Sequence, residues 1–214
     1  MKIMITVTLI NGTRITYNTF DEIVDHCKHQ ITILDCSHNQ LTELPESICE
    51  LINLQKLDCS KNKLTFLPES ICELINLKTL DCSNNKLTLL PGSIGELINL
   101  NNLYCYENQL TSLPESIGKL INLNILYCYE NKIKELPESI GDLINLEKIY
   151  CDNNKISELP TSIINLRNIK YFNKDELTLT PQQERYFNWI ESNKSYQFDE
   201  CVDMNLVKCA YFGV

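Results

Sequence analysis

Hydrophobic and polar positions recur along most of this chain with a period of 23 residues. The clearest marker is a Leu-Pro pair whose proline occurs six times at this spacing, as Pro45, Pro68, Pro91, Pro114, Pro137 and Pro160. Before each proline stands the same pattern of apolar residues with one asparagine. In the second unit it comprises Leu54, Leu57, Cys59, Asn62 and Leu64. Such a period indicates stacked repeat units, each of which buries its neighbours. We therefore predict six structural repeats over residues 31–168.

Within each repeat, the pattern predicts a short strand followed by a short helical return. Leu57 and Cys59 alternate with polar residues, as in a strand with one buried side. The proline then begins a one-turn or 3₁₀-like segment, and Ile48 and Leu51 of the first repeat are spaced to face the core. We expect the strands to stack in parallel at roughly 4.8 Å per repeat.

Two columns of identical residues follow from this stacking. One asparagine per repeat lies where the chain leaves the strand, and we predict that its amide satisfies buried backbone groups. These residues are Asn39, Asn62, Asn85, Asn108, Asn131 and Asn154. One cysteine per repeat takes an inward strand position, where a thiol packs as a small, inert hydrophobe. These residues are Cys36, Cys59, Cys82, Cys105, Cys128 and Cys151.

The repeated motifs resemble the leucine-rich-repeat family. The string L-x-x-L-x-C-x-x-N-x-L occurs six times in register, with Ile for Leu in places. The additional L-P-x-S-I-x-x-L-x-N-L stretch is similar to the 23-residue class found in Ras-group-associated intracellular proteins and in bacterial and giant-virus repeat proteins. The resemblance implies an α/β solenoid with short parallel strands on a concave face, short helical or 3₁₀ segments on the convex face, and non-repeat caps at both ends.

Both ends of the chain depart from the repeat and predict caps. Near the N-terminus, we expect a hairpin around Asn11-Gly12 followed by a short helix, Asp21–Cys27. Near the C-terminus, Thr180-Pro181-Gln182-Gln183 predicts a capping-box start for a helix. Its apolar residues would plug the last repeat: Tyr186, Phe187, Trp189 and Ile190. We assign residues 1–30 to the N-terminal cap, 31–168 to the repeats, and 169–214 to the C-terminal cap helix and tail.

Charge and hydropathy narrow the classes of partner. With 19 Lys and Arg against 28 Asp and Glu, the net charge of −9 repels nucleic acid and anionic membrane surfaces, so neither is expected as a partner. The apolar run Ile3–Ile10 is far shorter than the roughly 20 residues of a membrane-spanning helix, and no signal-peptide cleavage site follows it. We expect a cytoplasmic or otherwise intracellular monomer whose 11 cysteines are reduced.

The candidate binding residues occupy the outward positions of the strands, which are aspartates in the first three repeats and tyrosines in the last three. The central outward residue is Asp35, Asp58 and Asp81 in the first three repeats, and Tyr104, Tyr127 and Tyr150 in the next three. Tyr106 and Tyr129 stand beside the first two of these tyrosines. Clustered tyrosines are typical of protein-recognition hot spots, and the aspartates would favour a basic partner segment. We therefore predict a protein-binding module without catalytic activity.

Other interpretations of the same residues remain open. Tyrosine suits exposed strands, and the near-identical YCYENQL and YCYENKI favour a recent duplication that copied the tyrosines without selection for binding. His26-Cys27-Lys28-His29 lacks the paired spacing of a zinc site, and no phosphate loop or nucleophile motif occurs, so we expect no metal or cofactor.

Two rival functions are an enzyme and a self-associating structural protein. Cys201-Val202-Asp203 matches the Cys-x-Asp motif of bacterial effector ubiquitin ligases, which also carry leucine-rich repeats. Those enzymes need a large helical domain after the repeats, whereas 46 residues follow Asn168 here. Self-association would use the apolar C-terminal tail or an exposed strand edge.

Overall fold

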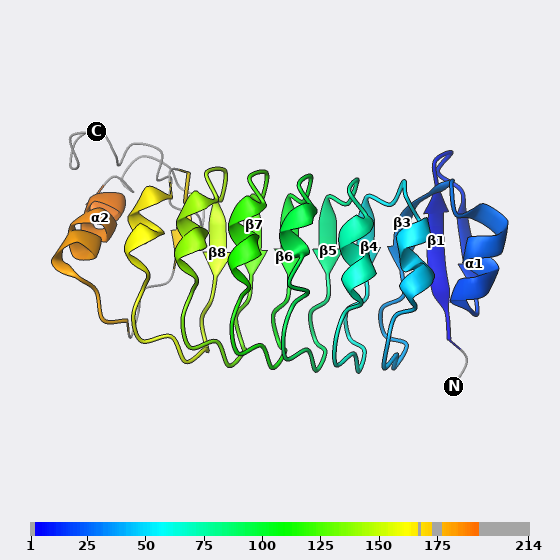
Figure 1. The fold of residues 1–214 in the computed structure, drawn as a ribbon, viewed down its shortest axis with the longest axis horizontal. Coiled ribbons are helices and arrows are strands. Elements are labelled where there is room, and N and C mark those ends of the chain that lie inside the picture. Colours follow the sequence, from blue (N-terminus) through cyan, green and yellow to red (C-terminus); the bar gives the residue numbers. More distant parts are fainter. Residues whose placement is uncertain (1–2, 167, 173–176, 193–214) are drawn as a thin grey trace.

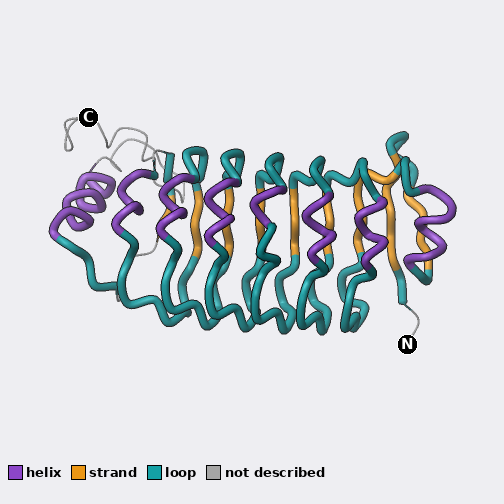
Figure 2. The backbone as a smooth tube through the Cα atoms, viewed as in Figure 1, coloured by secondary structure: helices purple, strands orange, loops and turns teal. Residues whose placement is uncertain are grey.

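A computed structural model describes residues 3–166, 168–172 and 177–192. It shows a solenoid of two layers, with a sheet on one side and short helices on the other (Figure 1). The sheet has nine strands in the order β2-β1-β3-β4-β5-β6-β7-β8-β9. Loops join the two layers along both edges of the solenoid (Figure 2). The predicted α/β solenoid is therefore confirmed.

Each repeat contributes one strand and one 3₁₀ helix. The repeat strands are β3 (Ile31–Asp35), β4 (Lys56–Asp58), β5 (Thr79–Asp81), β6 (Asn102–Tyr104), β7 (Ile125–Tyr127) and β8 (Lys148–Tyr150). The helices are η1 (Glu46–Glu50), η2 (Glu69–Glu73), η3 (Ile94–Glu96), η4 (Glu115–Lys119), η5 (Glu138–Asp142) and η6 (Thr161–Asn165). The strands pair in parallel with equivalent residues side by side, so Leu34, Leu57 and Leu80 form one buried row. Stacking of such rows makes the core continuous from end to end.

The asparagine column is confirmed as a hydrogen-bond ladder. Asn108 Nδ2 donates to the carbonyl oxygens of Cys82, Cys105 and Tyr106 at 3.0–3.2 Å. Its Oδ1 accepts the backbone N–H of Leu87 at 2.9 Å. The amide thus joins two successive repeats and provides partners for four backbone groups around this turn.

A second asparagine ladder runs along the edge that leads back to the strands. Asn76 Nδ2 donates to the carbonyl oxygen of Ile52 at 2.8 Å, and Asn99 does the same to Ile75. The equivalent bond to the preceding repeat is made by Asn122, Asn145 and Asn168, and Asn53 makes it to His29 of the N-terminal cap. Each repeat is therefore fastened to the previous one at both edges.

The N-terminal end is covered by a hairpin and a helix. The strands β1 (Ile5–Leu9) and β2 (Arg14–Tyr17) are antiparallel, and β1 also pairs antiparallel with β3. The helix α1 spans Phe20–Cys27 and buries Ile23 and Cys27. It begins one residue before the expected start because Thr19 caps it by accepting the N–H of Glu22 at 3.3 Å.

The C-terminal end carries the strand β9 (Tyr171–Phe172) and the helix α2 (Pro181–Ser192). The predicted capping box is present, because Thr180 N donates to Gln183 Oε1 at 2.9 Å and Gln183 N donates to Thr180 Oγ1 at 3.3 Å. Tyr186 and Phe187 are buried, and the Tyr186 hydroxyl donates to the carbonyl oxygen of Leu166 at 3.1 Å. The side chains of Trp189 and Ile190 and the tail 193–214 lie outside the described residues.

The column cysteines are buried, as predicted, and burial disfavours the charged thiolate form of their side chains. Burial raises the pKa of the Cys151 thiol to about 12 and raises the pKa of Cys105 and Cys128 well above the usual range. The thiolate is the reactive form, so we expect iodoacetamide at pH 8 to label these thiols only after unfolding in urea. Peptide mass spectrometry would measure the labelling. Half-buried Cys49 serves as the internal reference, and labelling of native Cys105 at the rate of Cys49 would contradict the prediction.

Candidate binding face

The outward side chains of β3 to β8 and of the residue two positions after each strand form one surface, which we call the strand face. The predicted residues lie together on it because the register of the parallel strands places equivalent positions side by side. Asp35 pairs with Asp58, and Asp58 pairs with Asp81. Asp81 pairs with Tyr104, and Tyr104, Tyr127 and Tyr150 complete the same row. The six residues chosen from the sequence therefore form a single row of half-buried side chains. The row changes from carboxylates to phenols between β5 and β6.

The tyrosines contact one another and form a connected cluster. The rings of Tyr106 and Tyr129 are stacked, with centroids 4.5 Å apart and planes inclined by 8°. Tyr127 makes edge-to-face contacts with Tyr104 at 5.2 Å and with Tyr150 at 4.5 Å. Mutual packing holds these rings in place, so the tyrosines themselves would lose little side-chain entropy when a partner binds them.

The aspartates are held by the serines two residues later. Asp81 Oδ1 accepts the backbone N–H of Ser83 at 3.0 Å and its hydroxyl at 2.6 Å. Asp35 with Ser37 and Asp58 with Ser60 make the same pair of bonds. Among the described residues, none donates a hydrogen bond to the second oxygen of these carboxylates. One oxygen of each carboxylate therefore fixes the turn that follows the strand.

Burial and like charge set the electrostatics of the face. Burial is the main cause that raises the pKa of Asp81, and the neighbouring Asp58 raises it further, while the bonds from Ser83 oppose the shift. Burial also raises the pKa of Tyr104, and that of Tyr129 reaches about 12. The row thus carries closely spaced negative charge at one end and neutral phenols at the other.

Other candidate residues give no comparable cluster. No group of three or more His, Cys, Asp or Glu side chains within the described ranges is placed to hold a metal ion. Cys201, the candidate nucleophile of the ligase-like alternative, lies outside the described residues. Among these same ranges, no helix is long and apolar enough to cross a bilayer.

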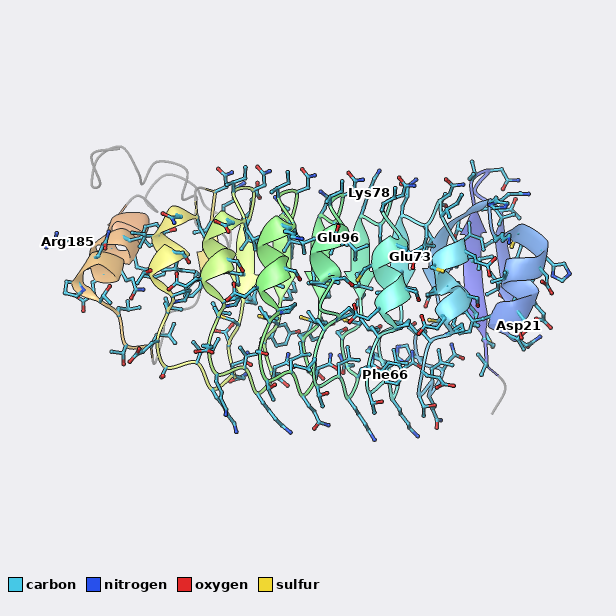
Figure 3. The ribbon with its side chains drawn as sticks, viewed as in Figure 1. Asp21, Phe66, Glu73, Lys78, Glu96 and Arg185 are labelled. Carbon is cyan, nitrogen blue, oxygen red and sulfur yellow. The ribbon has the colours of Figure 1, made fainter. Side chains whose placement is uncertain are left out.

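Exposed apolar residues on the two edges were not anticipated. Five isoleucines form a row along the edge of the solenoid on which Lys78 lies. Their side chains are 47–56% exposed: Ile52, Ile75, Ile98, Ile121 and Ile144. Phe66 and Leu89 are exposed by 51% and 56% on the opposite edge, and Figure 3 shows Phe66 and Lys78 at opposite edges. The sequence did contain a signal for this row. Each isoleucine is the second residue of a Leu-Ile-Asn-Leu string, a position that does not belong to the apolar pattern of the buried residues.

Family models agree with the architecture. One described as leucine rich repeats in two copies matches residues 29–71 and 52–97, and one described as a leucine rich repeat matches residues 145–166. With the solenoid described above, these matches identify the chain as a leucine-rich-repeat protein. No curated protein sequence matches it. Membership of the 23-residue, Ras-group-associated class rests on the sequence motif and stays a prediction.

Several solved structures are similar to this chain. A leucine-rich-repeat protein of Leptospira interrogans is 27% identical, with a TM-score of 0.59 over 79% of this chain and 55% of that one. The plant peptide hormone receptor RGFR1, in complex with RGF2, is 35% identical, with a TM-score of 0.60 over 69% of this chain and 24% of that one. The ectodomain of the Arabidopsis thaliana receptor kinase GASSHO1/SCHENGEN3, in complex with CASPARIAN STRIP INTEGRITY FACTOR 2, is 26% identical, with a TM-score of 0.65 over 73% of this chain and 20% of that one.

This chain therefore spans between 20% and 55% of the length of these three proteins. Repeat scaffolds of this kind commonly mediate protein–protein interaction through their extended surfaces. The scaffold does not specify the partner, because the same fold hosts unrelated interactions.

Proposed function

We propose that the chain is a protein-binding module that binds a partner protein through the strand face and has no catalytic activity of its own. The observation that carries this proposal is the cluster of five mutually packed tyrosines on the strand face. Tyrosine combines a large apolar area with a hydroxyl group, and such residues dominate the binding energy of many interfaces.

Two further observations support the proposal. The aspartate half of the row adds negative charge beside the tyrosines, which favours a partner with a basic segment. Two of the similar structures are receptors in complex with RGF2 and with CASPARIAN STRIP INTEGRITY FACTOR 2, so related scaffolds bind other molecules.

The test compares three baits in affinity capture from a lysate of the source cells. The baits are the wild-type chain, a Tyr106→Ser/Tyr129→Ser variant, and a control Ile75→Ser/Ile98→Ser variant with unchanged strand face. Serine occupies the positions equivalent to Tyr106 and Tyr129 in the first three repeats, so the tyrosine variant is compatible with the fold. Circular dichroism would check this.

We expect the tyrosine variant to bind the captured protein at least about tenfold more weakly, and the isoleucine variant to bind it like the wild type. Equal binding by all three baits would overturn the proposal and support the duplication origin of the tyrosines. Loss with the isoleucine variant alone would instead assign binding to the exposed isoleucine row.

Self-association is the second candidate, and the isoleucine row favours it because five half-exposed isoleucines lie along one edge. Sedimentation of the wild type and of the Ile75→Ser/Ile98→Ser variant distinguishes it from a monomeric module. A wild-type dimer that the substitutions dissociate would establish self-association through this edge.

A further inference from the structure

The isoleucine row forms a continuous apolar strip with a polar limit at each end. Its members occupy equivalent positions of five successive repeats, from Ile52 to Ile144, and each is about half exposed. At about 4.8 Å per repeat, the strip is roughly 19 Å long. The equivalent positions beyond its ends are His29 before the first isoleucine and Arg167 after the last. An exposed apolar strip with polar limits is typical of a surface that another segment covers.

The helix α2 directs the chain toward this row. Near its start, Gln183 Nε2 donates to the carbonyl oxygen of Pro160 at 3.0 Å, where η6 begins. One turn later, the Tyr186 hydroxyl donates to the carbonyl oxygen of Leu166 at 3.1 Å, where η6 ends. Leu166 is the equivalent of the leucine that precedes each exposed isoleucine. The helix therefore runs alongside η6 toward the edge of the isoleucine row, and it ends at Ser192 (Figure 1).

The sequence after Ser192 contains an apolar segment whose length matches the row. Residues 206–214 read LVKCAYFGV, and Lys208 is the one charged residue among them. In an extended conformation, residues 206–212 would span roughly 20 Å, about the length of the row. The 13 residues 193–205 that join this segment to α2 reach up to roughly 43 Å, so they are long enough to place it anywhere along the row.

From this arrangement we infer that the segment 206–214 packs along the isoleucine row of its own chain. Contact between the two removes apolar surface of both from water, which drives the packing. A short tether gives the segment an effective concentration in the millimolar range, so it has an advantage over a second copy at micromolar concentration. The inference is independent of the proposed function, because the row lies on an edge of the solenoid and not on the strand face.

The test places a photo-reactive residue in the tail of the full-length chain. p-Benzoylphenylalanine replaces Phe212, the chain is irradiated at low micromolar concentration, and mass spectrometry identifies the cross-linked peptides. In a control chain the same residue replaces Phe66, which lies on the opposite edge (Figure 3). Two further chains combine the probe at position 212 with Ile75→Ser/Ile98→Ser or with Phe66→Ser/Leu89→Ser. These two pairs are matched, because all four side chains are 51–56% exposed.

We expect the probe at position 212 to form cross-links within one chain to peptides that contain Ile75, Ile98 or Ile121. The probe at position 66 should not link to these peptides. Ile75→Ser/Ile98→Ser should lower the yield at least about fivefold, whereas Phe66→Ser/Leu89→Ser should leave it unchanged. Cross-links that join two chains would assign the row to a second copy and overturn the inference. Cross-links to the strand face, a yield insensitive to the isoleucine substitutions, or no cross-link at all would also overturn it.

Discussion

Replacement of Asn108 by alanine is expected to lower the free energy of unfolding by about 3 kcal/mol. Asn108 is buried and makes four hydrogen bonds that bridge two repeats. The largest loss is at Leu87, whose backbone N–H has the Asn108 amide oxygen as its acceptor. The Cys82 and Cys105 carbonyl oxygens are less affected, because Asn85 and Asn131 also donate to them.

Urea denaturation followed by circular dichroism measures this loss, and Asn99→Ala is the matched control. Asn99 is exposed and makes one bond to the carbonyl oxygen of Ile75, so its removal should lower the free energy of unfolding by about 1 kcal/mol or less. Equal losses for the two variants would mean that the buried ladder contributes no more than the exposed one.

The architecture could be predicted because it depends on a period, and a period of 23 residues is visible without knowledge of any contact. The buried leucines, the cysteine column and the Asn108 ladder all follow once the repeats are stacked in register. The strand-face row was predictable for the same reason. Equivalent positions of in-register strands are neighbours, whatever residues occupy them.

The remaining features depend on geometry that no local pattern encodes. One residue just after each repeat strand adopts the left-handed conformation, among them Lys61, Glu107 and Glu130 with φ of 51–53°, and the first repeat has a second such residue, Gln40. Asn and His favour this conformation and occupy three of the six strand ends, but Lys and Glu do not, so at the other three the residue type gives no signal for it. The stacked backbone imposes it, because Lys61 N donates to the carbonyl oxygen of Ser83 at 3.0 Å and Glu107 N to that of Tyr129 at 3.0 Å.

The chemistry of the strand face was also only partly predictable. The sequence shows a serine two residues after each of these aspartates. That Ser83 donates two hydrogen bonds to Asp81 Oδ1, from its backbone N–H and its hydroxyl, emerged only from the structure. The stacking of Tyr106 on Tyr129 depends on side-chain rotation, which is set by the neighbouring repeats.

Replacement of Gly118 by alanine is the second substitution with a large expected effect, a loss of about 2 to 3 kcal/mol in the free energy of unfolding. A Cβ atom at Gly118 in η4 would lie 2.6 Å from the carbonyl oxygen of Ser139 and 2.7 Å from the Ser139 Cβ. Both atoms belong to the following repeat and neither can rotate away. The helices η4 and η5 would therefore have to separate, although the ladders at both edges hold the repeats at a fixed spacing.

Gly92→Ala is the matched control, because a Cβ atom at Gly92 meets no atom within 4 Å. This control should leave stability unchanged or raise it by roughly 0.5 kcal/mol, since alanine restricts the unfolded chain. Thermal and urea unfolding of both variants measure the difference. If Gly118→Ala were as stable as Gly92→Ala, the helical layer would have to be loosely packed, and the spacing of the repeats would then be set by the strands and asparagine ladders alone.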